Sequence, residues 1–202
     1  MMLTNSKEDF QGLLKSDAGS TPPSKFGRTA FHYVQTGGLI LRSQLDCHHQ
    51  NLPRKIFDLK TRATIPIRLD VENYQNYLNY RLRKPTGLFE SFEREYYDMV
   101  RSAFLKFSLQ VRIGKMDGIM VGFHNTEEIF GFQYIPLSEM DFCVFGNSQF
   151  ADASFSLCIK IFDNMLQEVT SRFPGRDLRV TFHSQLTNSV SIVFRLFFVK
   201  LC

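Results

Sequence analysis

The sequence lacks the features that mark several large classes of protein. Its four cysteines lie far apart and form no C-x-x-C pair, so neither a zinc module nor a disulfide scaffold is predicted, and reduced cysteines in an intracellular compartment are expected. No segment approaches the roughly 20 apolar residues of a membrane span. The N-terminus MMLTNSKEDF has no arginine-rich amphipathic run, so no transit peptide is visible. A G-x-x-x-x-G-K phosphate loop is also absent.

The composition is that of a folded domain with a mildly basic surface. A length of 202 residues fits one domain or one domain with an appendage, and 44% hydrophobic residues with 21 phenylalanines can form a real core. The charged fraction of 22% makes global disorder improbable. Lysine and arginine exceed the acids by 24 − 20 = +4, and residues 42–84 alone carry nine basic and four acidic residues, or +5. This local excess indicates an anionic partner there.

The order of helical and strand patterns predicts an α+β or mixed α/β fold. Residues 1–24 are expected to form a short helix and a Ser/Pro-rich linker, followed by one domain over residues 25–202. Within that domain the expected strands cover 30–47 (a hairpin turning at Gly37-Gly38), 55–66, 108–125, 128–137, and a closing hairpin over 178–199. The expected helices cover 70–84, 87–107 and 150–172. The last residues, VFRLFFVKLC, are apolar to the end, which suggests a fragment of a longer protein.

Two acids and a lysine stand among strand residues in the first third of the chain. In KIFDLKTRA, Asp58 and Lys60 share one face of the strand because residues two apart project together, and Arg62 joins them. If residues 39–47 pair antiparallel with 55–63, Asp46 falls on the neighbouring strand. Two adjacent carboxylates repel, and a divalent cation would resolve that repulsion. Mg²⁺ or Mn²⁺ held by Asp46 and Asp58, with Lys60 beside it, would suit phosphodiester hydrolysis.

A simpler interpretation stays open, because a lone D-x-K on a strand is usually a solvated ion pair. The apolar surroundings of Asp58, the second acid and the local basic excess favour a reaction centre. Other candidates have equally simple alternatives. Asp117 with Gln133 is a rival acid pair, although Asp117-Gly118 is more simply a strand-end feature.

Further polar side chains could contribute to binding. His48 and His49 follow Asp46, but a histidine pair in a polar loop is usually exposed. Three tyrosines, with Arg81 and Arg83, could stack on bases and bind phosphates, although core packing explains Tyr74 equally well: Tyr74, Tyr77 and Tyr80. The acids of the long helix are interpreted as a solvated face, with Glu93 as a possible helper at the site: Glu90, Glu93, Glu95 and Asp98.

The arrangement of hairpin, acid, short loop and apolar strand with D-x-K resembles the PD-(D/E)xK nuclease superfamily. The resemblance implies that Asp46, Asp58 and Lys60 form the catalytic triad and that the two acids bind metal. Many members add a glutamate from a preceding helix, and Glu8 is the candidate here, with Asp9 or an upstream segment as alternatives. A Q-x-x-x-Y helix of some members is not matched, because the fourth residue after Gln75 is an asparagine.

Longer stretches carry a more specific resemblance. LRSQLDC, IFDLKTRATIPIRLD, ESFEREYYDMVRSAFLKFSLQVRIGKMDGI and FHNTEEIFGFQYIPLSEMD are similar to the fungal mitochondrial RNA 5′-end-processing protein family, known first from yeast "Pet" respiratory mutants. The resemblance implies a mitochondrial location, peripheral association with the inner membrane, 5′-to-3′ RNA trimming and contact with the mitochondrial RNA polymerase. Because members are much longer and carry an import signal, this chain looks like a partial copy.

Two functions follow from these observations as hypotheses. The first is a metal-dependent exoribonuclease of mitochondrial RNA 5′-end processing and turnover. The second is a non-catalytic module that binds RNA or the RNA polymerase. In either case the basic residues of the motif region are the expected nucleic-acid contacts: Arg42, Arg62, Arg81, Arg83 and Lys84.

Overall fold

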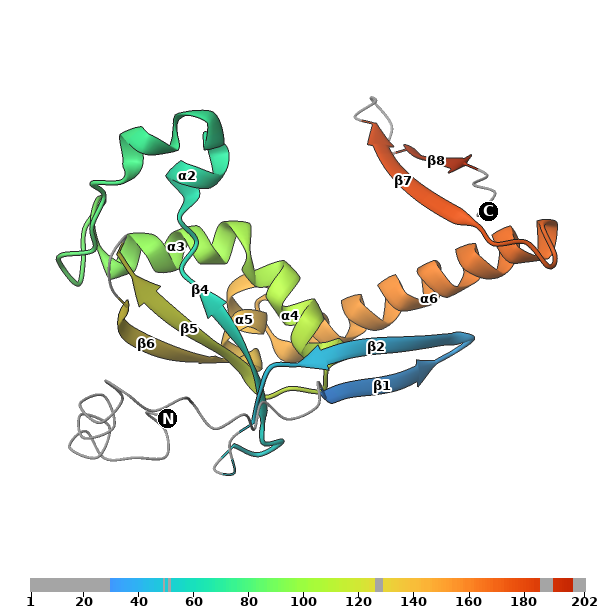
Figure 1. The fold of residues 1–202 in the computed structure, drawn as a ribbon. Helices are drawn as coiled ribbons and strands as arrows, with labels where there is room; N and C mark the ends of the chain where they lie inside the picture. The colour runs from blue at the N-terminus through green and yellow to red at the C-terminus, as the bar shows by residue number, and fades with distance from the viewer. Residues whose placement is uncertain (1–29, 49, 51, 126–128, 186–190, 198–202) are drawn as a thin grey trace, which may run out of the picture. The chain divides into compact units, whose positions relative to one another are not determined.

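The computed structural model describes residues 30–48, 50, 52–125, 129–185 and 191–197 (Figure 1). The strands are β1 (Ala30–Thr36), β2 (Leu39–Leu45), β3 (Cys47–His48), β4 (Ile56–Thr61), β5 (Gly118–His124), β6 (Ile129–Pro136), β7 (Arg179–Gln185) and β8 (Ser191–Phe197). The helices are α2 (Ile65–Leu69), the 3₁₀ helix η1 (Val71–Tyr77), α3 (Phe92–Ser102), α4 (Phe104–Ile113), α5 (Leu137–Phe145) and α6 (Ser148–Arg172). The predicted mixture of helices and strands in one α+β chain is confirmed.

The chain divides into two compact units. The first comprises residues 1–35 and 40–155, and the second comprises residues 36–39 and 156–202. The boundary expected near residue 24, and the helix expected before it, lie outside the described residues. All the site residues described below belong to the first unit.

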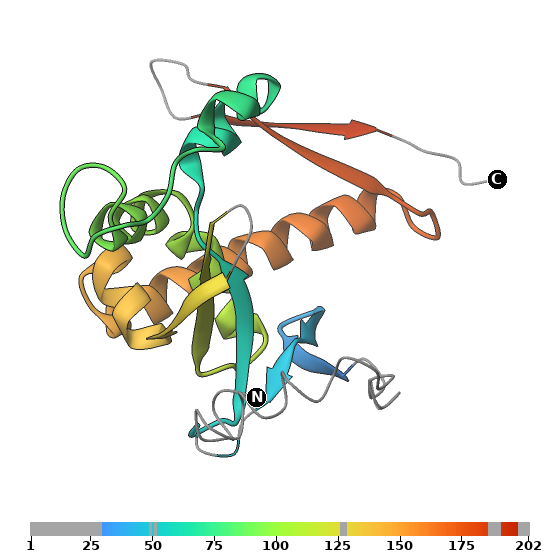
Figure 2. The ribbon, with the colours of Figure 1, turned by 60° about the vertical axis from the view of Figure 1, so that its left-hand side comes forward.

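A four-stranded sheet in the order β3-β4-β5-β6 organises the first unit. β3 and β4 are antiparallel, β4 and β5 are parallel, and β5 and β6 are antiparallel. α3, α4 and α5 pack on one face of this sheet (Figures 1 and 2). That face of the sheet presents Ile119, Val121 and Ile135, which are fully buried against Phe104 and Met140 of the helices. The core therefore lies between the sheet and its three helices.

β5 is buried along nearly its whole length, as expected for a strand with neighbours on both sides. Its first residue, Gly118, lies so close to the Ile135 carbonyl on β6 that a Cβ would collide with it. Only glycine allows the two backbones to approach at this point. A larger residue at position 118 would displace β6.

The helix predicted over residues 87–107 is two helices, α3 and α4. The second of these, α4, extends into the strand predicted over residues 108–125. The chain breaks at Ala103, whose φ of −131° is not helical, and α4 then continues to Ile113. The expectation that the strand begins at residue 108 was therefore wrong. Phe104, Phe107 and Val111 are buried at helical spacing, which overrides the alternating pattern of LQVRI.

The helix predicted over residues 70–84 was also wrong. Within this range only residues 71–77 are helical, as the 3₁₀ helix η1, and Asp70 and Asn73 are in non-helical conformations. The strand expected over residues 55–66 is also shorter, because β4 ends at Thr61 and α2 begins at Ile65. Val71 and Tyr74 of the expected apolar face are exposed, so burial cannot stabilise a longer helix there. α5, which was not predicted, begins directly after β6 and buries Met140.

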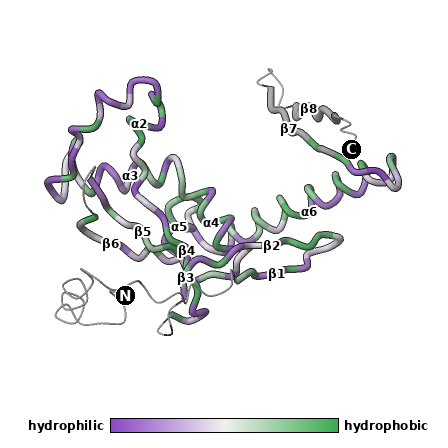
Figure 3. The backbone as a smooth tube through the Cα atoms, viewed as in Figure 1, coloured by the Kyte–Doolittle hydropathy of each residue, from purple (hydrophilic) through white to green (hydrophobic). Residues whose placement is uncertain are grey.

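The remaining elements agree with expectation. β1 and β2 form the predicted hairpin, β7 and β8 pair antiparallel, and α6 covers the predicted helix. Hydrophilic and hydrophobic residues alternate along α6 (Figure 3). In the second unit, Asp163 of α6 accepts a hydrogen bond from the Gly38 amide at 3.0 Å. Within the described residues, no helix has the length and apolar character needed to cross a membrane.

Candidate functional site

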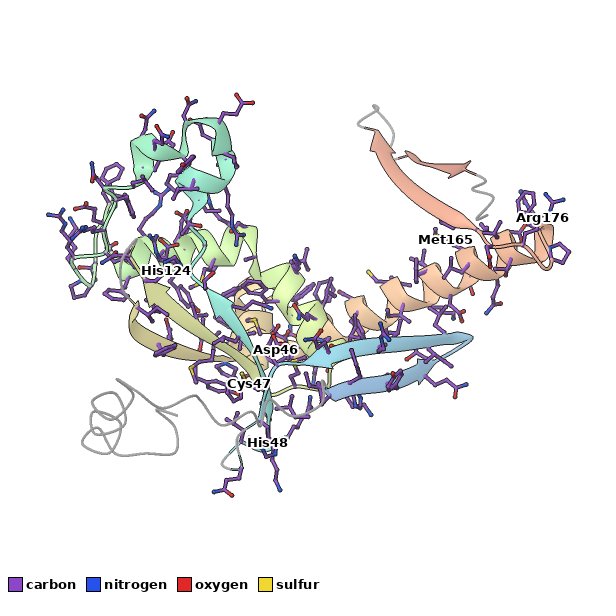
Figure 4. All side chains as sticks on the ribbon, viewed as in Figure 1. Asp46, Cys47, His48, His124, Met165 and Arg176 are labelled. Carbon is purple, nitrogen blue, oxygen red and sulfur yellow. The ribbon has the colours of Figure 1, made fainter. Side chains whose placement is uncertain are left out.

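The short antiparallel pairing of β3 with β4 brings the two predicted acids together. Cys47 pairs with Phe57 and His48 with Ile56, and the same register continues to place Asp46 opposite Asp58. Residues directly opposite on antiparallel strands project from the same face with their Cβ atoms about 5 Å apart. Figure 4 shows Asp46 between the end of β2 and β4. The predicted convergence of these two side chains thus follows from strand register.

Lys60 completes the cluster from the same strand as Asp58. Its Nζ lies 2.5 Å from Oδ2 of Asp58, and its ammonium sits 5.3 Å from the ring centroid of Phe107 on α4. The ammonium is held between a carboxylate and an aromatic face, a position favourable to a cation. The Asp58 side chain is fully buried and that of Lys60 is 19% exposed. Apart from this ion pair, neither oxygen of Asp58 meets a hydrogen-bond donor among the described residues.

The surroundings of Asp58 disfavour its ionised form. Burial and the neighbouring Asp46 carboxyl raise the pKa of Asp58, the Lys60 ammonium lowers it, and the net result is a pKa of about 6. Burial also raises the pKa of the Cys47 thiol, with added repulsion from both acids, so this thiol remains protonated near neutral pH. The ionised form of the Asp58 carboxyl is therefore less favourable here than in water, despite its ion pair with Lys60.

The donor set fits a hard divalent cation in part. Two adjacent carboxylates, one with buried and unsatisfied oxygens, are the ligands that Mg²⁺ or Mn²⁺ takes in proteins. In the part of the chain that the structure describes, no set of three or more histidine, cysteine, aspartate or glutamate side chains is placed to hold a metal. Glu8, the predicted third acid, and its alternative Asp9 lie outside the described residues. The third ligand stays a prediction.

Arg62 has a different role from the one predicted. Its side chain is 6% exposed, its Nε donates to the His124 carbonyl at 2.6 Å, and its NH1 lies 3.0 Å from Oε2 of Glu95. Glu95 also accepts from the Thr64 amide at 2.8 Å. The expectation that Arg62 contacts nucleic acid was therefore wrong, because its guanidinium is buried and tethers the end of β4 to α3.

The other predicted basic contacts are exposed. The Arg42 guanidinium lies over the Phe31 ring at 4.7 Å, on the hairpin that leads to Asp46. Arg81, Arg83 and Lys84 lie on the loop before α3, where Arg83 forms a solvent-exposed ion pair with Glu90 at 3.5 Å. These side chains remain available to phosphate groups, and their assignment to nucleic acid stays a prediction.

The rival candidates have structural roles or no contact with the cluster. Asp117 accepts from the Arg54 amide at 2.9 Å and the Ile56 amide at 3.3 Å, which fixes the start of β4. Glu93 accepts from the Gly87 amide at 2.7 Å. His48 is exposed, and its neighbour at position 49 lies outside the described residues.

Two acids of α3 were wrongly expected on a solvated face. Glu95 and Asp98 are buried, with side chains 3% and 6% exposed, and each pairs with arginine. Both lie close in sequence to Met99, which is fully buried. The spacing of Glu95 four residues before Met99 was the only signal in the sequence that it faces the core.

The raised pKa of Asp58 predicts a pH-dependent stability. Because the pKa is about 6 when folded and 3.8 otherwise, the folded chain holds this proton more tightly. Ionising Asp58 therefore lowers the free energy of unfolding. This loss is absent below pH 4, grows between pH 4 and 6, and reaches about 3 kcal/mol above that window. Asp58→Asn should therefore stabilise the metal-free chain near pH 7.5 and lose that advantage towards pH 4. Urea unfolding of both proteins in EDTA across this pH range tests the expectation. A difference in free energy of unfolding that does not change with pH would contradict it.

Comparison with known proteins places the site inside a recognised family region. The family described as "Mitochondrial protein Pet127" matches residues 1–167. The Schizosaccharomyces pombe protein named "mRNA degradation protein pet127, mitochondrial" is 44% identical over 165 residues, covering 79% of this chain and 32% of that protein. The Saccharomyces cerevisiae "Putative mitochondrial translation system component PET127" is 52% identical over 126 residues, covering 59% of this chain and 16% of that protein. The chain thus spans a third or less of these relatives.

Proposed function

This chain belongs to the mitochondrial protein Pet127 family, and on that basis and the geometry of its acid–lysine cluster we propose that it is a metal-dependent ribonuclease-like protein of mitochondrial RNA turnover. The observation that carries the proposal is the buried Asp58 carboxylate with Lys60 Nζ 2.5 Å away and Asp46 opposite it. The order of these residues along a hairpin and a strand supports a PD-(D/E)xK nuclease-like core. The pombe relative's name, which refers to mRNA degradation, supports RNA as the substrate.

The residues would divide the work of phosphodiester hydrolysis. Asp46 and Asp58 would hold Mg²⁺ or Mn²⁺, which when bound supplies Lewis-acid activation at the phosphate. The Lys60 ammonium, fixed between Asp58 and the Phe107 ring, would neutralise negative charge that develops on the phosphate in the transition state. Because Lys60 is held before substrate arrives, it needs no reorganisation at that step.

Location and partners come from the family. Its members are described as mitochondrial, so the mitochondrial location expected from the sequence is confirmed at family level. Trimming of RNA 5′ ends, contact with the mitochondrial RNA polymerase and peripheral association with the inner membrane remain parts of the proposal, supported by resemblance.

A non-catalytic RNA- or polymerase-binding module is the second candidate. It is favoured by one observation: the described residues bring two carboxylates together but not three. The name of the cerevisiae relative, a putative translation system component, is compatible with such a role. Under this alternative, the cluster would stabilise the fold and RNA would bind without being cleaved.

Hydrolysis of RNA by the 202-residue chain decides between the two candidates. We expect a 5′-monophosphorylated single-stranded RNA to be degraded with Mg²⁺ and to remain intact with EDTA. Lys60→Met keeps much of the side-chain length but removes the charge, so it should lower kcat on the order of 10²-fold with little change in KM. Lys160→Met, an exposed lysine of α6, is the matched control. An intact substrate with folded wild-type chain, or an unchanged kcat in Lys60→Met, would support the non-catalytic candidate.

A further inference from the structure

Beside the acid–lysine cluster, β2 and α4 enclose an open groove of about 590 Å³. Its lining includes two cations and no acid, together with an apolar floor, and six of its residues matter here: Arg42, Lys106, Gln110, Leu105, Leu109 and Ile113. Both cations are exposed. The groove thus combines positive charge at the rim with apolar surface inside.

The two elements that form the groove also lead to the cluster. Arg42 lies on β2, which ends one residue before Asp46. The other wall is α4, which also carries Phe107; this side chain is buried in the core, does not line the groove and lies under the Lys60 ammonium. A Cβ added at Gly114 would lie 3.1 Å from the Ser43 hydroxyl, which shows how closely β2 approaches the end of α4. A ligand that follows β2 along the groove would therefore run towards Asp46.

The chemistry of the lining selects one class of ligand. Phosphate groups pair with exposed arginine and lysine, and unpaired bases offer apolar faces and amide-binding edges. A duplex hides its bases and would leave the leucine and isoleucine floor uncovered. An acidic protein helix is the other occupant that such a groove could take, but the continuity with a phosphodiester-cleaving site favours nucleic acid.

We infer that the β2–α4 groove is the track that holds single-stranded RNA next to the acid–lysine cluster, with Arg42 and Lys106 on phosphates and the apolar floor against bases. The inference rests on the proposed function, since it assigns the substrate path of that same site. It adds Lys106 and Gln110, which the sequence did not single out, and gives Arg42 a place in the path.

RNA affinity without hydrolysis tests the track. A fluorescein-labelled 12-nucleotide single-stranded RNA is titrated with the full chain in EDTA, and anisotropy is followed from 50 to 300 mM salt. Removing two phosphate contacts should weaken binding roughly 25-fold at 0.1 M salt and reduce the salt slope by about 1.4. The variant is the double substitution Arg42→Ala with Lys106→Ala. The control is Lys160→Ala with Arg176→Ala, which removes the same charge from exposed positions in and after α6 (Figure 4).

The two proposals fail in different ways. If the Arg42/Lys106 variant binds RNA as the control does, the track is overturned, and an acidic protein partner becomes the better occupant, whatever the hydrolysis assay gives. If that variant loses affinity and salt slope while Asp58→Asn still hydrolyses RNA at the wild-type rate, the track stands and the nuclease proposal fails. Circular dichroism of both double variants should match wild type, since all four side chains are exposed.

Discussion

Asp58→Asn is expected to lower Mg²⁺-dependent RNA hydrolysis on the order of 10³-fold, because it removes the proposed anionic metal ligand, and 10³-fold corresponds to about 4 kcal/mol of transition-state stabilisation. The carboxylate is fully buried, and among the described residues only the Lys60 ammonium pairs with it, so losing its negative charge removes that one ion pair. Asparagine has the same shape and removes the repulsion with Asp46. The variant should therefore lose activity while keeping, or raising, its stability.

The measurement combines single-turnover hydrolysis with thermal unfolding. Glu72→Gln, an exposed acid of η1, removes one negative charge elsewhere and should leave both properties unchanged. Asp46→Asn should resemble Asp58→Asn in activity, because the two acids would share one ion. RNA hydrolysis by Asp58→Asn at the rate of Glu72→Gln would exclude a catalytic role for the cluster. Loss of both activity and fold would instead mark Asp58 as a structural residue, contrary to the proposal.

Glu95→Ala is expected to lower the free energy of unfolding by about 3–5 kcal/mol, because it leaves the buried Arg62 guanidinium without its partner. It also removes the acceptor of the amide of Thr64, which lies just before α2 in a left-handed conformation at φ 48°. This one carboxylate thus fixes the strand of Asp58 and Lys60 to α3. A weaker attachment should also reduce RNA hydrolysis by loosening the cluster.

Urea unfolding of matched variants tests this expectation. Glu168→Ala breaks an ion pair with Arg172 whose two side chains are both more than 60% exposed, so it should cost at most about 1 kcal/mol. Replacing Arg62 and Glu95 together by leucine removes both charges and should recover most of the loss. A Glu95→Ala chain as stable as Glu168→Ala would mean that the Arg62–Glu95 pair contributes nothing to the fold.

Part of the site could be predicted because it depends on local geometry. Asp58 and Lys60 share a face by the two-residue period of a strand, and the short loop after Asp46 favours the antiparallel register that sets the acids opposite each other. The helix of residues 70–84 was predicted wrongly for the opposite reason: Val71 and Tyr74, at the start of its expected apolar face, are exposed and meet no buried surface. The strand predicted from residue 108 was wrong because the short pattern LQVRI is compatible with both a strand and a helix, and only packing against the sheet decides between them.

The sequence by itself determined the mixed α+β class, the hairpins, α6, the pairing of Asp58 with Lys60 and the resemblance to a mitochondrial family that comparison confirms. These follow from local periodicity and from long similar stretches. Only the tertiary structure decided that Arg62 is buried against Glu95, that Phe107 lies beneath Lys60, and that Arg42 and Lys106 border one groove. Each of these contacts joins residues more than 30 positions apart, and no local pattern specifies them because they arise only when β2, β4, α3 and α4 pack together.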